Sequence, residues 1–257
     1  KNEMYGEVHF LRAFFYFELV KIYGDVPLFT HGRLTAGDSG TLTRVPKSEV
    51  YAVIESDLNS AISALPAQKS TDGRATSFTA HALLGKVYLY QGKYSEAANI
   101  LEPLIGLYTL PSNPGSVFLV SGENGPESVF EIQHSKESNG WNWGWLPQST
   151  EGNFGVIHHG IRGYNGPTYS SGWSFNVPTD EFHKSFKSGD KRRDASILDI
   201  VKWAEDNNAS YNEGYEHTGY FNNKYIPRQG YSKNTMELNY ENNYRYLRYA
   251  DVLLMAA

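Results

Sequence analysis

Residues 78–105 hold the pattern that most constrains the fold, because two short helical segments follow one another with a glycine between them. Phe78 to Tyr90 and Tyr94 to Ile105 each repeat apolar side chains at three- and four-residue spacing. Gly92 lies in the short connection, and a connection of this length favours two antiparallel helices. The segment therefore predicts a helix hairpin.

Small and large side chains in this hairpin fall at the offsets that are typical of a tetratricopeptide repeat. Gly85 and Ala97 would let the two helix backbones approach closely. Leu84, Tyr88 and Leu101 would fill the volume beside that contact. One repeat of this kind cannot bury its own apolar face, so the sequence predicts neighbouring helices on either side.

Three other segments could supply those neighbours. Residues 3–23 carry a helical apolar stripe that ends at Gly24, and residues 46–64 carry another that begins with Pro46. The chain finishes in an apolar run over residues 247–257. We therefore predict a mainly α fold, a solenoid of tetratricopeptide-like helix pairs.

The composition changes at Pro111, after which Gly, Asn, Ser, Pro and Tyr dominate. Weak strand patterns occur at residues 128–133 and 220–226, and one helix is predicted over 179–187 with Thr179 as its N-cap. This part reads as a loop-rich insertion with a few short strands. The predicted division is a helical scaffold over 1–110, a ligand-binding insertion over 111–245, and the start of the next scaffold helix over 246–257.

The insertion contains a dense aromatic stretch at residues 139–175. It holds four of the chain's five tryptophans and eight glycines, with Glu151 and Arg162 as its two formal charges. Flat rings beside amides and hydroxyls suit a neutral ligand with C–H faces and many hydroxyl groups, as in a sugar. The alternative is that the rings form a small satellite core under a long loop.

Within this stretch, Trp141, Trp143 and Trp145 alternate along the chain. In an extended segment they would point the same way and form a stacking platform. Trp173 and Phe175 are expected instead to anchor the insertion to its scaffold. The predicted ligand-contacting residues are Trp141, Asn142, Trp143, Trp145, Arg162, Tyr164 and Tyr169.

Charge and composition exclude several other functions. The formal net charge is -5 without a basic stripe, which argues against nucleic-acid binding. Cysteine is absent, which excludes disulfides, thiol nucleophiles and cysteine-based zinc sites. A glycosidase needs two carboxylates at a defined separation, and the aromatic stretch offers only Glu151. The adjacent pair His158-His159 lacks the spacing of metal ligands. We predict no catalysis, no cofactor and no metal.

Several segments together resemble the SusD/RagB family, the surface lipoproteins with which Bacteroidota capture nutrients, mostly glycans. The segments that carry the resemblance are Phe10–Ala13, Tyr23–Leu28, Arg74–Thr76, Ala82–Leu89, Glu127–Gln133, Asn176–Thr179 with Asp190 and Arg193, and Leu247–Met255. The resemblance implies tetratricopeptide-like helix pairs, a TonB-dependent transporter of the SusC type as partner, and ligand capture without catalysis. It also implies attachment to the outer face of the cell outer membrane through a lipidated cysteine. This sequence lacks that cysteine, so we expect the chain to be a fragment.

The leading hypothesis is a non-catalytic glycan-binding surface protein that captures oligosaccharide or polysaccharide for import through a SusC-type transporter. One alternative is a member of the same family that captures peptides or proteins. A second is a helical-repeat adaptor without a small ligand.

Overall fold

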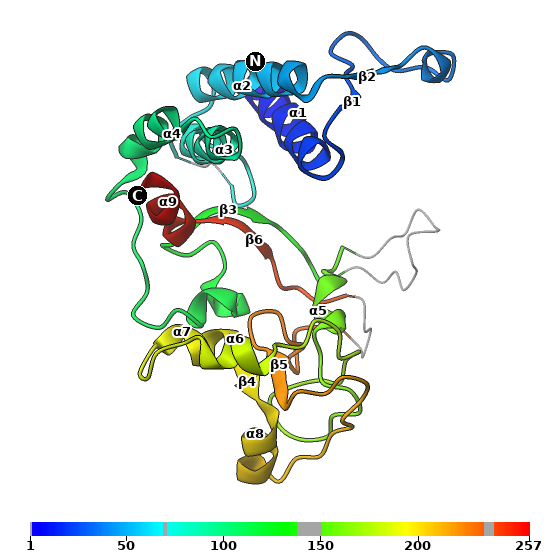
Figure 1. Cartoon of the computed structure of the whole chain (residues 1–257), viewed down its shortest axis with the longest axis vertical. Helices are drawn as coiled ribbons and strands as arrows, with labels where there is room; N and C mark the ends of the chain where they lie inside the picture. The colour runs from blue at the N-terminus through cyan, green and yellow to red at the C-terminus, as the bar shows by residue number, and fades with distance from the viewer. Residues whose placement is uncertain (1, 69–70, 138–150, 234–238) are drawn as a thin grey trace. The chain divides into compact units, whose positions relative to one another are not determined.

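The protein is described by a computed structural model that covers residues 2–68, 71–137, 151–233 and 239–257 (Figure 1). The chain divides into two compact units, one formed by Lys1–Tyr108 with Leu247–Ala257 (unit 1) and the other by Thr109–Tyr246 (unit 2). The predicted division sets its boundaries after residues 110 and 245.

Unit 1 is the helical part of the chain. Its helices are α1 (Asn2–Tyr23), α2 (Lys47–Ala64), α3 (Ser77–Tyr90), α4 (Tyr94–Leu101) and α9 (Tyr249–Ala256). Each helix packs against the next in sequence, and α9 returns to contact α3 and α4. Between α1 and α2, strand β1 (Val26–Pro27) pairs antiparallel with β2 (Arg44–Val45). The predicted helices over 3–23, 46–64 and 78–90 are confirmed.

Two predicted helix boundaries in unit 1 are wrong. The second helix of the hairpin ends at Leu101, and a 3-10 turn over Glu102–Leu104 follows it because Pro103 cannot donate an α-helical hydrogen bond. The terminal helix starts at Tyr249, later than predicted, since residues 244–248 form strand β6 (Tyr244–Arg248). Arg248 N donates to Asp251 Oδ2 at 3.1 Å, which caps the helix at that point.

Helix α1 is apolar on two faces. Phe10, Phe17 and Val20 are buried in the core, whereas Val8, Phe15 and Ile22 are between 60% and 70% exposed. The exposed set also follows helical spacing. This second stripe explains why the helix shows no clean alternation of apolar and polar faces in the sequence.

A buried carboxylate joins α1 to α2. Asp57 is 2% exposed and accepts hydrogen bonds from Arg12 Nε at 2.6 Å and Arg12 Nη2 at 2.7 Å. His9 Nδ1 lies 2.6 Å from the same carboxylate. The hydrogen bonds to Asp57 raise the pKa of the Arg12 guanidinium. The sequence pattern does not predict this pairing, because Arg12 and His9 lie 45 and 48 residues from Asp57.

The close packing of α3 against α4 depends on the absence of a side chain at Gly85. A Cβ atom at this position would lie 2.5 Å from Leu101 Cγ and Cδ2. Leu101 is fully buried, so its side chain would have to shift within the core to admit the added atom. The predicted close approach at Gly85 is confirmed, and the side chain that occupies the space is Leu101.

Unit 2 is built from short elements. Its helices are α5 (Gly155–His158), α6 (Asp180–Lys184), α7 (Lys191–Ser196) and α8 (Ile200–Asn207). Strand β3 (Ser128–Ile132) pairs with β6, and β4 (Ile197–Asp199) pairs antiparallel with β5 (Tyr220–Asn222). The predicted helix over 179–187 and strands over 128–133 and 220–226 are present in shorter form. Asp190 Oδ1 accepts from Arg192 N at 2.9 Å and starts α7.

Two apolar clusters hold unit 2 together. The larger is centred on β4, β5 and α8, and consists of Ile161, Tyr164, Tyr169, Leu198, Ile200, Phe221 and Ile226. The smaller consists of Val156, Ile157 and Tyr240, with Phe154, Trp173 and Tyr231 packed against it. The aromatic residues of the insertion therefore contribute to its core as well as to its surface.

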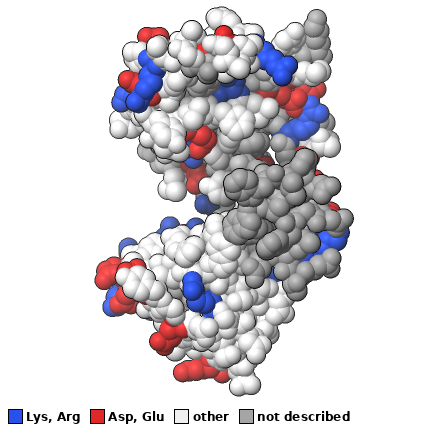
Figure 2. Space-filling view, turned by 90° about the vertical axis from the view of Figure 1, so that its right-hand side faces the viewer, with Lys and Arg blue, Asp and Glu red and all other residues white. Residues whose placement is uncertain are grey.

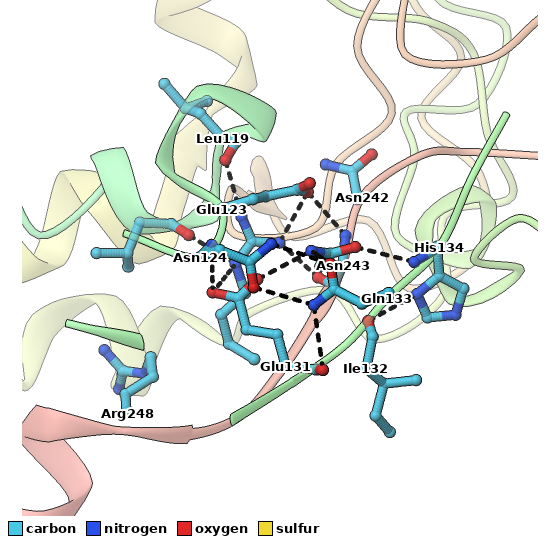
Figure 3. A network of polar contacts seen from close by, with 12 residues as sticks. Leu119, Glu123, Asn124, Glu131, Ile132, Gln133, His134, Asn242, Asn243 and Arg248 are labelled. Carbon is cyan, nitrogen blue, oxygen red and sulfur yellow. Dashed lines mark hydrogen bonds and ion pairs between the residues drawn. The ribbon is translucent and has the colours of Figure 1, made fainter. Parts of the chain in front are cut away.

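A buried polar network joins the 3-10 turns over Ser116–Gly122 to strands β3 and β6 (Figure 3). At its centre, the Arg245 side chain is 1% exposed and its Nη1 lies 3.2 Å from Glu123 Oε1. Glu131 is also buried, and Asn243 Nδ2 donates to its Oε2 at 3.0 Å. Burial raises the pKa of Glu123, against the opposing effect of its bonds to Asn243 and Arg245.

Replacing Gly85 with valine should destabilise unit 1 by about 1–3 kcal/mol, because the added carbons overlap Leu101 in a packed core. Urea unfolding followed by far-UV circular dichroism measures the loss. Gly40→Val is the matched control, since no atom lies within 4 Å of a Cβ there. A Leu101→Ala background should reduce the cost of Gly85→Val, and an undiminished cost would contradict the proposed clash.

Replacing Arg245 with leucine should destabilise unit 2 by about 3–5 kcal/mol, because it leaves the buried Glu131 and the half-buried Glu123 without their cation. Tryptophan fluorescence during urea unfolding reports on this unit alone, since all five tryptophans lie within residues 141–203. Lys202→Ala removes an exposed ion pair with Asp206 and should change nothing measurable. Similar losses of unfolding free energy in both variants would show that the buried network contributes no more to stability than an exposed ion pair.

Candidate ligand-binding site

The residues predicted to contact a ligand divide into three groups. Trp141, Asn142, Trp143 and Trp145 lie outside the described residues. Arg162 is exposed. Tyr164 and Tyr169 are 9% and 4% exposed, so the structure separates the two tyrosines from the rest.

Tyr164 and Tyr169 belong to the interior of unit 2. Their rings meet edge to face at 6.0 Å, and the Tyr169 ring meets Trp203 in the same way at 5.0 Å. The Tyr164 hydroxyl donates to Pro167 O at 2.8 Å and accepts from Trp203 Nε1 at 2.9 Å. Burial raises the pKa of Tyr169. This environment speaks against the predicted ligand contacts, because a ring must be exposed to stack on a sugar.

Three other rings form a partly exposed cluster, which we call the ring surface: His158, Trp173 and Phe175. The His158 ring centroid lies 5.0 Å from that of Trp173 and 5.8 Å from that of Phe175, and the last two are 6.1 Å apart. Phe175 is 54% exposed. A partly exposed aromatic cluster of this size is suited to contact the C–H face of a ligand.

Trp173 connects the ring surface to the smaller apolar cluster of unit 2. It packs against the cluster of Val156, Ile157 and Tyr240, and its backbone N–H donates to Ile157 O at 3.0 Å. These partners all belong to unit 2, so Trp173 is part of the insertion's own core, and its anchoring to the helical scaffold stays a prediction. The same prediction for Phe175 is wrong, because more than half of that side chain faces solvent.

The backbone around Phe175 explains its exposure. Ser174 and Asn176, on either side of it, have φ of 58° and 54°, a left-handed conformation that is uncommon for residues other than glycine. Ser174 N donates to Gly160 O at 2.8 Å, and Phe175 N donates to His158 O at 2.7 Å. These bonds hold the segment in place and direct Phe175 outward.

A close glycine contact fixes the ring surface to α5. A Cβ atom on Gly172 would lie 2.3 Å from Gly160 Cα, and one on Gly160 would lie 2.5 Å from Gly172 Cα. The two backbone segments therefore touch, and a side chain at either position would push them apart. This contact sets the spacing between His158 and the Trp173–Phe175 segment.

Arg162 lies at the edge of the ring surface. Its Nη2 donates to Trp173 O at 2.7 Å, and its backbone N–H donates to Ser174 Oγ at 3.0 Å. The guanidinium carries five N–H donors, so further donors remain beside the rings. Of the predicted ligand-contacting residues within the described part of the chain, Arg162 is the one whose position suits that role.

His159 follows His158 directly in the chain. Its Nδ1 is buried without a hydrogen-bond partner among the described residues, and burial lowers the pKa of its imidazole. Within residues 2–68, 71–137, 151–233 and 239–257, histidine and acidic side chains form no group that could hold a metal ion. We therefore treat His159 as a packing residue.

Charged side chains are dispersed over the described surface. Figure 2 shows lysine and arginine interspersed with aspartate and glutamate on the face in view, without a continuous basic area. The helices in the described ranges are too short or too polar to span a bilayer.

Two family descriptions match this chain. Residues 1–89 match a family described as starch-binding and associating with the outer membrane, and residues 199–257 match the SusD family. The chain is 28% identical to SusD-like protein P2 of Formosa agariphila over 269 residues, which cover the whole chain and 51% of that relative.

The chain belongs to the SusD/RagB family. Among solved structures it is similar to a laminarin-binding SusD-like protein, with a TM-score of 0.87, 39% identity, and coverage of 98% of this chain and 58% of that one. It is also similar to surface glycan-binding protein A of Bacteroides thetaiotaomicron in complex with laminarihexaose, with a TM-score of 0.81, 26% identity, and coverage of 98% and 56%. The chain spans about half the length of these SusD-like relatives.

The lowered pKa of His159 gives a pH prediction for this region. A histidine whose pKa is lower in the folded protein favours unfolding when it is protonated, so stability present above its usual pKa of about 6.5 is lost as the pH falls. The free energy of unfolding should therefore decrease from about pH 7.5 to about pH 5.5. His159→Asn should show a smaller decrease, measured by urea unfolding with tryptophan fluorescence.

His134, whose pKa burial also lowers, should leave part of the decrease in place. His31→Asn is the control, since His31 is an exposed histidine of unit 1. If His159→Asn lost as much stability on acidification as the unchanged protein, protonation of His159 would not be the cause of that loss.

Proposed function

We propose that this protein is a non-catalytic glycan-binding subunit of a nutrient uptake system at the cell outer membrane. The observation that carries the proposal is its likeness, over 98% of the chain, to solved SusD-like proteins that bind laminarin and laminarihexaose. The partly exposed rings of His158, Trp173 and Phe175 on unit 2 are consistent with such a role.

In this proposal the ring surface contacts the C–H faces of sugar rings, with Phe175 as the most exposed element. Arg162 donates hydrogen bonds to sugar hydroxyls at its edge. Trp141, Trp143 and Trp145, with Asn142, remain part of the proposed binding surface on the strength of their sequence pattern alone. Binding and release require no covalent step, so no acid, base or nucleophile is assigned.

The proposal includes a partner and a location. A TonB-dependent transporter of the SusC type would receive the glycan, and a lipid anchor would hold the protein at the outer membrane. The family description for residues 1–89, which names association with the outer membrane, supports this part. Pull-down of a co-expressed transporter would test it.

Phe175→Ala should weaken laminarihexaose binding by about 3- to 10-fold, because it removes an exposed stacking ring. Isothermal titration calorimetry measures the affinity. The melting temperature should stay unchanged, since little packing is lost. Phe182→Ala is the matched control, as Phe182 is 48% exposed on α6 of the same unit.

Single alanine variants of Trp141, Trp143 and Trp145 test the sequence-based part of the site. Undiminished binding in all three variants would remove these residues from the site. A peptide competition on the same protein separates glycan capture from peptide capture. If no glycan of a broad panel bound, including laminarihexaose, the proposed function would be wrong.

A further inference from the structure

Unit 2 contains a cavity of about 560 Å³ that shares no residue with the ring surface. This volume lies within the range of about 300–1,000 Å³ that is typical of small-ligand sites. Its walls come from the loop before the 3-10 turn over Ser116–Phe118, from α7, and from the segment after β5. The side chains that matter here are Asn113, Ser116, Lys191, Asp194, Asn223 and Arg228.

The cavity walls are held by hydrogen bonds. Asn113 closes its own loop, because its Oδ1 accepts from Gly115 N at 2.9 Å and its carbonyl accepts from Ser116 Oγ at 2.8 Å. Across the cavity, Asn223 N donates to Ser196 O and its Nδ2 donates to Asp194 O, both at 2.9 Å. The cavity is therefore already formed in the absence of a ligand, which lowers the entropic cost of binding.

Positive charge dominates the lining. Lys191 and Arg228 form no ion pair within the described part of the chain. The one acidic side chain, Asp194, accepts from Arg193 Nε at 2.8 Å. The whole chain has a net charge of -5, so an excess of cations at one cavity runs against its overall balance.

Arg228 is held in a fixed position. Its Nη2 donates to Asn223 Oδ1 at 3.1 Å, and its guanidinium lies 5.0 Å from the centroid of the buried Tyr169 ring. A guanidinium held by a ring and an amide keeps further N–H donors in a planar fork. Such a fork matches the two oxygens of a carboxylate or a sulfate.

Arg228 also lines a second cavity of about 400 Å³ in the same unit. That cavity is lined by hydroxyl and amide groups, including Ser170, Gln229 and Tyr240. Hydroxyl and amide side chains are the usual partners of neutral sugar hydroxyls. A cationic cavity thus adjoins a neutral polar one through a shared arginine.

We propose that the 560 Å³ cavity binds the anionic group of an acidic saccharide, a uronate carboxylate or a sulfate ester, between Lys191 and Arg228. This inference rests on the proposed function, in which the ligand is a glycan. Asn113, Ser116 and Asn223 then hydrogen-bond the neutral hydroxyls of the same sugar. The site would favour acidic over neutral saccharides, whereas the ring surface makes no such distinction.

The test compares two trisaccharides of the same linkage, one of β-1,4-linked glucuronic acid and one of β-1,4-linked glucose, by calorimetric titration. The acidic trisaccharide should bind more tightly, and added sodium chloride should weaken it. Arg228→Gln and Lys191→Gln should each weaken it by about tenfold. Lys202→Gln is the control, because Lys202 is an exposed lysine of unit 2 that lines neither cavity.

Arg228 packs on Tyr169, so Arg228→Gln could lower stability as well as affinity. Lys191 is exposed on α7, and Lys191→Gln decides the question if the first variant fails to fold. A sulfated glucose trisaccharide distinguishes the two anionic groups. Equal affinity for acidic and neutral trisaccharides, or unchanged affinity in Lys191→Gln, overturns the proposal.

Laminarihexaose separates this proposal from the function on which it rests. If laminarihexaose binds and the acidic trisaccharide does not, the cavity proposal is overturned and the glycan-binding function stands. If the acidic trisaccharide binds through Lys191 and Arg228 while laminarihexaose does not, the cavity proposal stands and the ring surface loses its assigned role.

Discussion

The buried guanidinium of Arg245 is the interaction on which the loop-rich unit depends. Its Nε, Nη1 and Nη2 donate to the carbonyls of Val117, Asn243 and Leu119, respectively. In a helix or a sheet such carbonyls would be satisfied by regular backbone partners, and leaving them buried and unpaired is costly. One arginine side chain therefore pairs the buried backbone carbonyls of these loops, as backbone N–H groups do in a helix or a sheet. Glu123 and Glu131 offset its charge and complete the network.

The scaffold helices α1 and α2 were predictable because each is long enough to repeat its apolar pattern several times. Residues 3–23 and 46–64 show three or more helical turns of that pattern, and the structure follows it closely. Helices α7 and α8 have six and eight residues, and, unlike the eight-residue α4, neither follows a long patterned helix in a hairpin. Their local signals are capping aspartates: Asp190 starts α7 and Asp199 Oδ1 accepts from Lys202 N at the start of α8.

The candidate site was harder to predict than the fold, because composition does not separate a buried ring from an exposed one. Tyr169 and Phe175 lie in the same glycine-rich stretch, yet one packs on Trp203 and the other faces solvent. The exposure of Phe175 follows from the left-handed backbone conformation of Ser174 and Asn176, which the residue types do not predict. Likewise, the pairing of Tyr169 with Arg228 joins residues far apart in sequence, and it needs three-dimensional contacts to be seen.

The contact between Gly160 and Gly172 also limits how this surface could change during evolution. Both positions are closed to any larger residue, since an added Cβ would meet backbone atoms at 2.5 Å or less. His158 and Phe175 carry no such restriction, because their side chains lie at the surface rather than between two backbones. A lineage that adapted this surface to a new ligand could exchange those two rings while the glycine pair preserved the geometry that displays them.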